Sequence, residues 1–125
     1  MTARQIIDRV NEIKPNAFTD AVKLYWLNEL EGRIAAEVML MPQRQIQELQ
    51  LGLTDTPMVE APYDSLYLYW LEARIDEANG EYDKYDTTAA LFNAAWSGFA
   101  CWFAQTYDPA QGYVDEERRK DNGTL

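Results

Sequence analysis

Carboxylates are the only side chains with catalytic chemistry that the sequence offers in number. Those flanking the Asn79-Gly80 pair are Glu72, Asp76, Glu77, Glu81, Asp83 and Asp86. Hard cations take several oxygen ligands, and a helical bundle can supply them from acids three or four residues apart. The 72–86 carboxylates could therefore serve a magnesium-dependent, all-helical nucleotide hydrolase. A solvated acidic corner is the simpler interpretation, because Asp76 and Glu77 fall beside the apolar seam of their helix, at an accessible corner.

Groups for nucleophilic or redox catalysis are scarce in the sequence. The chain has no histidine, which excludes Ser-His-Asp and Cys-His catalysis and any imidazole-ligated metal. Its one cysteine, Cys101, stands between Ala100 and Trp102 and is expected to be a small buried apolar residue. There is no glycine-rich phosphate loop and no dinucleotide fingerprint. These absences leave the 72–86 carboxylates as the candidate catalytic groups of the chain. A single cysteine suits a reducing compartment.

The charge of the chain is strongly negative and unevenly distributed. The 125 residues include 21 acids and 11 bases, a net charge of −10. Residues 48–117 hold 14 acids but only Arg74 and Lys84, whereas residues 1–47 are neutral and residues 118–125 carry +2. Binding to DNA or to an anionic membrane needs clustered bases, so we expect neither. An acidic DNA-mimic protein stays an alternative, because its phosphate-like spacing of acids would be visible only in three dimensions.

The chain is expected to form a single helical domain over residues 1–107, followed by a carboxy-terminal tail over residues 108–125. Its length suits one domain, and apolar positions recur three and four residues apart along most of it. We predict an all-α fold, a small bundle of four to five helices with a helical hairpin at about 62–107. Residues 43–51 are equally compatible with a short helix and a loop, and residues 54–61 indicate a loop.

Capping residues mark the expected helices of the amino-terminal half. Thr2 and Gln5 have the spacing of a capping box, in which each side chain satisfies a free backbone N–H of the other. The helix that they begin is expected to end at the first proline. A second helix is expected to begin near Asn16 or Thr19 and to run to about Leu40, where another proline stops it.

The hairpin is predicted from start and stop signals and from one apolar seam. Pro62 suits a first helical turn and the Asn79-Gly80 pair suits a left-handed corner, so helices are expected over 62–79 and 81–107. The second of these helices has a heptad-like seam formed by Tyr82, Tyr85, Ala89, Phe92, Trp96, Phe99 and Phe103. Small residues on its remaining faces would allow close approach of another helix, so we expect this helix to be buried on more than one side.

Several short runs of the sequence resemble the motifs of one protein family. The runs are Trp26-Leu-Asn-Glu-Leu-Glu-Gly-Arg-Ile34, Pro62-Tyr-Asp-Ser-Leu-Tyr67, Leu71-Glu-Ala-Arg-Ile-Asp76, Asn79-Gly-Glu-Tyr82, Leu91-Phe-Asn93 and Phe99-Ala-Cys-Trp102. They resemble motifs of the head–tail connector proteins (adaptor or head-completion proteins) of tailed phages and prophages. The resemblance covers residues 5–40 and 60–107, and its motifs are packing motifs rather than catalytic ones.

The resemblance implies a structural protein that docks under the portal protein as a ring after DNA packaging. Such a ring connects the head to a tail-side neck protein and continues the DNA channel, so that DNA passes without being specifically bound. The resemblance implies no enzymatic activity and no cofactor. It also implies a chain that is monomeric in isolation, self-associates in the particle, and is found in the host cytoplasm during assembly and then in the virion neck.

Aromatic residues at the start of the hairpin are the first candidate contacts for such an assembly. Tyr63, Tyr67 and Trp70 lie off the leucine-rich seam of their helix. Tyr and Trp are favoured anchors of protein interfaces, so we expect these three to contact a neighbouring subunit or the portal. The alternative is that a second face of this helix packs against the second helix of the same chain.

Charged residues form two further candidate sets. The tail contributes a candidate docking peptide for the portal, Arg118, Arg119 and Lys120. The acidic corner contributes a candidate lining of the DNA channel, Glu77, Glu81 and Asp83. Like charge on a channel wall would keep passing DNA from sticking, although surface acids also maintain solubility.

Overall fold

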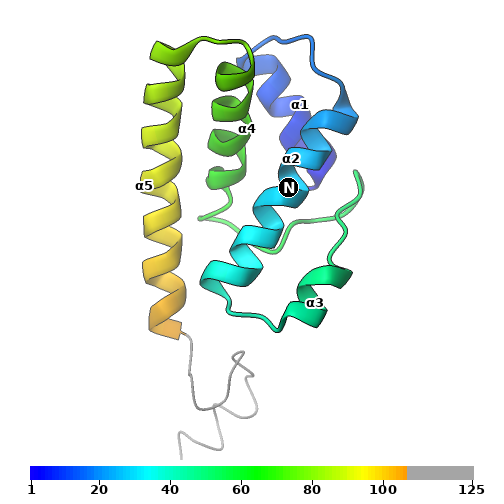
Figure 1. Ribbon diagram of the computed structural model, residues 1–125, viewed down its shortest axis with the longest axis vertical. Helices are drawn as coiled ribbons and strands as arrows, with labels where there is room; N and C mark the ends of the chain where they lie inside the picture. Colours follow the sequence, from blue (N-terminus) through cyan, green and yellow to red (C-terminus); the bar gives the residue numbers. More distant parts are fainter. Residues whose placement is uncertain (107–125) are drawn as a thin grey trace, which may run out of the picture.

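The computed structural model of the protein describes residues 1–106, which form five α-helices and one π-helical turn, with no β-strand in that range (Figure 1). The predicted all-α fold, a small helical bundle with a carboxy-terminal hairpin, is therefore confirmed. The tail and its Arg118, Arg119 and Lys120 lie outside the described residues.

Helix α1 (Ala3–Ile13) begins with the predicted capping box. The Thr2 hydroxyl accepts the Gln5 N–H (3.2 Å), and the Gln5 side chain accepts the Thr2 N–H (2.8 Å). Two more N–H groups at this helix end donate to carbonyls of a distant loop, from Ala3 to Asp55 and from Arg4 to Leu53, both at 2.9 Å. The loop therefore supplies the acceptors that the first turn of α1 lacks.

Helix α2 (Asp20–Arg33) starts at the predicted Thr19 cap, whose hydroxyl accepts the N–H of Val22. It continues into a π-helical turn, η1 (Ile34–Val38), that the sequence analysis did not predict. The turn is closed by the Met39 N–H, which donates to the Ile34 carbonyl five residues earlier (3.0 Å). The chain then leaves the helical path at Leu40, whose φ of 54° is left-handed.

Residues Gln43–Glu48 form a short helix, α3. Of the two structures expected for residues 43–51, a short helix or a loop, the short helix is therefore the correct one. None of its residues is buried, and it lies beside the end of the bundle rather than within it (Figure 1). The segment 49–61 that follows has no helix or strand, as predicted for residues 54–61.

The predicted hairpin is formed by helices α4 (Ser65–Ala78) and α5 (Tyr82–Thr106), which lie side by side (Figure 1). Gly80 turns the corner between them with a φ of 72°, a conformation that costs glycine little. The expectation that Pro62 begins the first helix is wrong. The Tyr63 N–H donates to the Glu60 carbonyl (3.0 Å), which closes a turn here and delays the helix to residue 65.

Helix α5 lies at one edge of the bundle, where it packs along α4 and contacts η1 (Figure 1). Its predicted seam is buried at Phe92, Phe99 and Phe103, whereas Tyr82 at the start of the seam is exposed. The expectation that this helix is buried on more than one side is wrong. Most of the small residues opposite the seam face solvent, because no other described element covers that side of α5.

A largely buried ion pair joins the end of α1 to α4 of the hairpin. The carboxylate of Asp76 in α4 is fully buried, and both of its oxygens lie 2.6 Å from the Lys14 ammonium at the end of α1. The Thr88 hydroxyl of α5 lies 3.1 Å from the same carboxylate. The interpretation of Asp76 as part of a solvated corner is therefore wrong, because this acid is turned inward and paired with a base 62 residues away in the sequence.

We expect Asp76→Asn to lower the free energy of unfolding by about 3 kcal/mol, because it leaves the Lys14 ammonium without its partner at a partly buried site. Glu77→Gln, one residue along on the exposed side, is the matched control and should change stability by less than about 0.5 kcal/mol. Urea unfolding followed by circular dichroism measures both. Equal effects of the two substitutions would contradict the structural importance of the ion pair.

Candidate functional site

Tyr67, one of the three expected interface residues, is fully buried inside its own chain. Its hydroxyl donates a short hydrogen bond to the Glu31 carboxylate of α2 and accepts the N–H of Val59 (3.0 Å). Burial and the Glu31 charge raise the pKa of the Tyr67 hydroxyl, so it stays protonated and keeps donating. The expectation that Tyr67 contacts a neighbouring subunit is wrong, because α4 turns this residue toward α2.

Trp70 and Tyr63 are partly buried, and both make defined contacts within the chain. The Trp70 indole N–H donates to the Trp26 carbonyl (2.7 Å). The Tyr63 ring stacks on Trp102 with centroids 5.0 Å apart and planes 28° from parallel. Much of each ring therefore packs within the chain, as in the alternative expectation. That the accessible parts of Tyr63 and Trp70 contact another protein stays a prediction.

Two arginines cover the side of the hairpin that faces α2. The Arg74 guanidinium lies over Trp26 and Trp70, 5.7 and 5.3 Å from the ring centroids. The Arg33 guanidinium lies over Trp70 and Trp96, at 5.7 and 4.9 Å. Cation–π contacts of this kind are favourable and directional. The alternating stack links α2, α4 and α5, and it uses one of the two bases that residues 48–117 contain.

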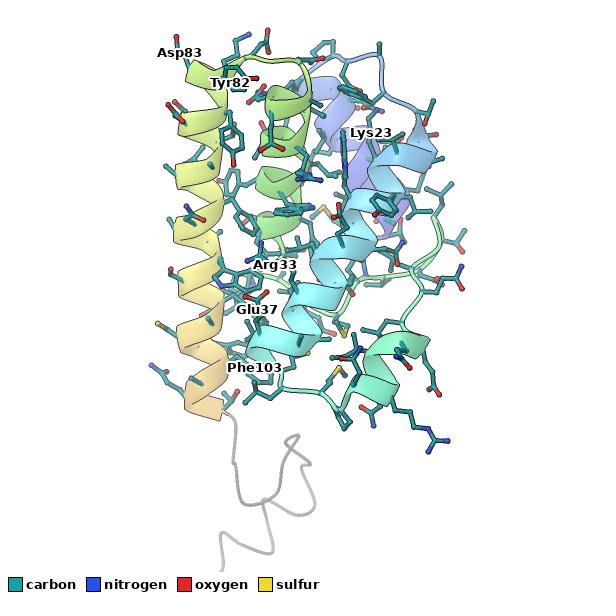
Figure 2. The ribbon with its side chains drawn as sticks, viewed as in Figure 1. Lys23, Arg33, Glu37, Tyr82, Asp83 and Phe103 are labelled. Atoms are coloured by element: carbon teal, nitrogen blue, oxygen red, sulfur yellow. The ribbon has the colours of Figure 1, made fainter. Side chains whose placement is uncertain are left out.

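The acidic corner divides into one inward and several outward carboxylates. Glu77, Glu81 and Asp83, the candidate channel-lining residues, are all exposed. Figure 2 shows Tyr82 and Asp83 at the end of the bundle where α4 turns into α5. Two of the acids have only surface ion pairs, Glu77 with Arg74 (3.5 Å) and Glu81 with Lys84 (3.4 Å).

Within residues 1–106, these carboxylates do not converge on a point where a cation could bind. No group of three or more acids, cysteines or histidines comes together in this part of the chain. Asp76 is the inward carboxylate, and Lys14 already neutralises it. Burial raises the pKa of Glu72, and the charge of Lys14 opposes this effect. The geometry gives no support to a metal-dependent hydrolase.

The side of α5 away from the bundle is an uncovered apolar strip. We call it the α5 outer face; its members are Ala90, Leu91, Ala94, Gly98 and Cys101. All are exposed, and Leu91, the large residue among them, exposes 46% of its surface. Cys101 is thus exposed, and its expected burial is wrong because it projects opposite the seam.

A sequence signal for the α5 outer face exists and was missed. Residues 87–106 contain no acid and no base, although 26% of the chain is charged. On a solvent-facing helix such a run is unusual, because exposed faces of soluble helices normally carry charges. The same small residues predict close approach of another helix, but no described helix covers them. Depletion of charge on an exposed face is instead typical of the core of a protein–protein interface.

Comparison with known proteins returns no match. No family model, no curated protein and no solved structure matches this chain. The resemblance to head–tail connectors therefore rests on its sequence motifs alone. None of the helices in the described part of the chain combines the length and the apolar character that a bilayer span requires.

Polar side chains of α2 hold the segment 49–61 against the bundle. Asn28 pairs with the backbone of Leu51 in both directions, accepting its N–H at 2.7 Å and donating to its carbonyl at 3.0 Å. The buried Glu31 carboxylate accepts the Met58 N–H (3.0 Å) besides the Tyr67 hydroxyl. Burial raises the pKa of Glu31, and these two hydrogen bonds only partly offset the effect.

The raised pKa of Glu31 predicts a pH dependence of stability. The folded state holds the proton of Glu31 more tightly than the unfolded state, so its stabilising contribution is present below the ordinary value of 4.5 and is lost as the pH rises through the raised pKa. The loss is about 1.4 kcal/mol for each unit by which the pKa is raised. Glu31→Gln removes the titration and keeps an acceptor for Met58.

Unfolding free energies of both proteins from pH 4 upward test this. The stability of the wild type relative to Glu31→Gln should fall as the pH rises. Gln47→Asn, at an exposed residue of α3 without a titratable group, should show a constant difference from the wild type. A wild-type advantage that grows with pH would mean that the hydrogen bonds to ionised Glu31 outweigh its burial.

Proposed function

We propose that the chain is a non-enzymatic structural adaptor of a phage neck. It docks under the portal protein as a ring, connects the head to a tail-side neck protein, and continues the DNA channel. The observation that carries the proposal is the α5 outer face, an exposed and charge-free strip along the longest helix of the chain. Such a strip serves assembly with another protein surface better than it serves solubility.

The distribution of acids supports the same proposal. Glu77, Glu81 and Asp83 are exposed at one end of the bundle, away from the middle of the α5 outer face. A subunit with an uncharged side and an acidic end could pack against other proteins and still present negative charge to a channel. The sequence motifs that resemble those of head–tail connectors lie mainly on α2, α4 and α5, the helices that build this arrangement.

The portal protein encoded in the same genome is the partner that tests the proposal. Electron microscopy of the chain mixed with that portal should show added annular density on one face of the portal ring. The variant Leu91→Lys, which places a charge on the α5 outer face, should lose this density. Ile13→Lys, at an exposed apolar residue of α1, should keep it. Portal particles unchanged by the wild-type chain would contradict the proposed function.

A channel lining at the acidic corner predicts an effect on DNA movement. Replacing Glu77, Glu81 and Asp83 with lysine should slow DNA ejection from assembled particles and make it depend on salt, because lysines form phosphate contacts that salt weakens. The matched control replaces Glu37, Glu48 and Glu60, which are also exposed, with lysine. The same ejection rate in both triple variants would count against a lining role for this corner.

A further inference from the structure

A pocket opens between α2 and the segment 49–61, in a part of the molecule that the proposed function does not use. Its volume is about 290 Å³, close to the lower end of the range for sites that bind small ligands. Glu31 and Asn28 of α2 form one wall, and residues of the segment 49–61 form the others. We call this cavity the Glu31 pocket. It shares no residue with the α5 outer face.

The Glu31 carboxylate is a buried charge without a counter-ion. Glu31 is 4% exposed, and its two oxygens accept the Tyr67 hydroxyl and the Met58 N–H, which are neutral donors. No base among residues 1–106 forms an ion pair with it, whereas Asp76, the other buried carboxylate, is paired with Lys14. A carboxylate can accept about four hydrogen bonds, so Glu31 keeps unused acceptor positions. Its charge is weakly screened at this depth and attracts a cation.

The rest of the pocket also suits a cation that is carried on an apolar chain. Asp55 lines the pocket with an exposed carboxylate, so it lies toward the open side. One of its oxygens accepts the Gly52 N–H at 2.7 Å, and the other has no partner among residues 1–106. No base lines the pocket. Three apolar side chains complete the lining toward the segment, those of Leu49, Leu51 and Met58.

We propose that the Glu31 pocket binds an organic cation, a guanidinium or ammonium group at the end of a short alkyl chain. The charged group lies against Glu31, and the alkyl chain packs on the apolar lining and leaves the pocket past Asp55. A divalent metal fits less well, because it takes several charged ligands and no three acids, cysteines or histidines come together within residues 1–106. This inference goes beyond the proposed function, and each can fail without the other.

Propylguanidinium and propylurea, which have nearly the same shape and differ in charge, test whether the pocket selects a cation. Each is added to the full chain at neutral pH and followed by NMR. The Met58 N–H reports on the site because it donates to Glu31, and the Gly80 N–H at the hairpin corner is the internal control. We expect a dissociation constant at least tenfold lower for propylguanidinium, which corresponds to about 1.4 kcal/mol. Equal affinities for the two compounds, or no binding of either, would overturn the proposal.

Three variants locate the binding. Glu31→Gln should remove the preference for the cation. Asp55→Asn keeps Glu31 and its hydrogen bonds, so the chain should fold and bind propylguanidinium about threefold more weakly. Glu29→Gln is the matched control, because it removes a charge from the same helix at a residue that pairs with Arg74 and does not line the pocket. Unchanged binding in Asp55→Asn, or an equal loss in Glu29→Gln, would show only a general attraction to a negative protein and would overturn the site.

Two further probes distinguish the possible sources of the cation. Acetyl-Gly-Arg-Gly-amide represents a basic side chain of a partner protein, and putrescine represents a free amine. Tighter binding of the peptide would assign the pocket to a protein partner, and tighter binding of putrescine would assign it to a small molecule. Either result supports the proposal, whereas failure of both probes to move the Met58 signal contradicts it.

Discussion

The buried carboxylate of Asp76 is the constraint on which the arrangement of the helices depends. A carboxylate without solvent exposure is costly unless a charge and hydrogen-bond donors meet it. Lys14 from α1 and Thr88 from α5 do so, and the acid itself belongs to α4. A conformation in which α1 shifts along α4 leaves this charge without its ammonium partner, and one in which α5 separates from α4 removes the Thr88 hydrogen bond. The Thr88 hydroxyl therefore favours the orientation in which its side of α5 faces α4.

Other polar contacts also determine which surfaces of the helices are covered within the chain. The Arg33 and Arg74 guanidiniums lie between tryptophan rings of three helices and cover the side of the hairpin next to α2. Glu31 and Asn28 satisfy backbone groups of the segment 49–61 and hold it on the bundle. The polar groups of these contacts are thus satisfied inside the chain. The α5 outer face has no such partner among the described residues.

Signals that act over a few residues allowed most of the fold to be predicted. The Thr2 capping box, the Thr19 cap, the Gly80 corner and the seam of α5 depend on neighbours in sequence, and the structure contains each of them. Asp76 was misjudged because its partner lies 62 residues away, and no local pattern distinguishes it from the exposed acids around it. Tyr67 was misjudged for the same reason, since its hydroxyl is matched by Glu31 on another helix. Helical spacing separated the two faces of α5 but could not tell which one the rest of the chain covers.

In the proposed function, the α5 outer face is covered in the assembled particle and open in the free chain. The native Cys101 reports on this without any substitution, because it lies on that face. The most direct measurement is its rate of alkylation by a maleimide in the isolated protein and in intact particles. The account predicts fast alkylation of the isolated protein and strong protection in the particle. Equal rates in the two states would contradict it.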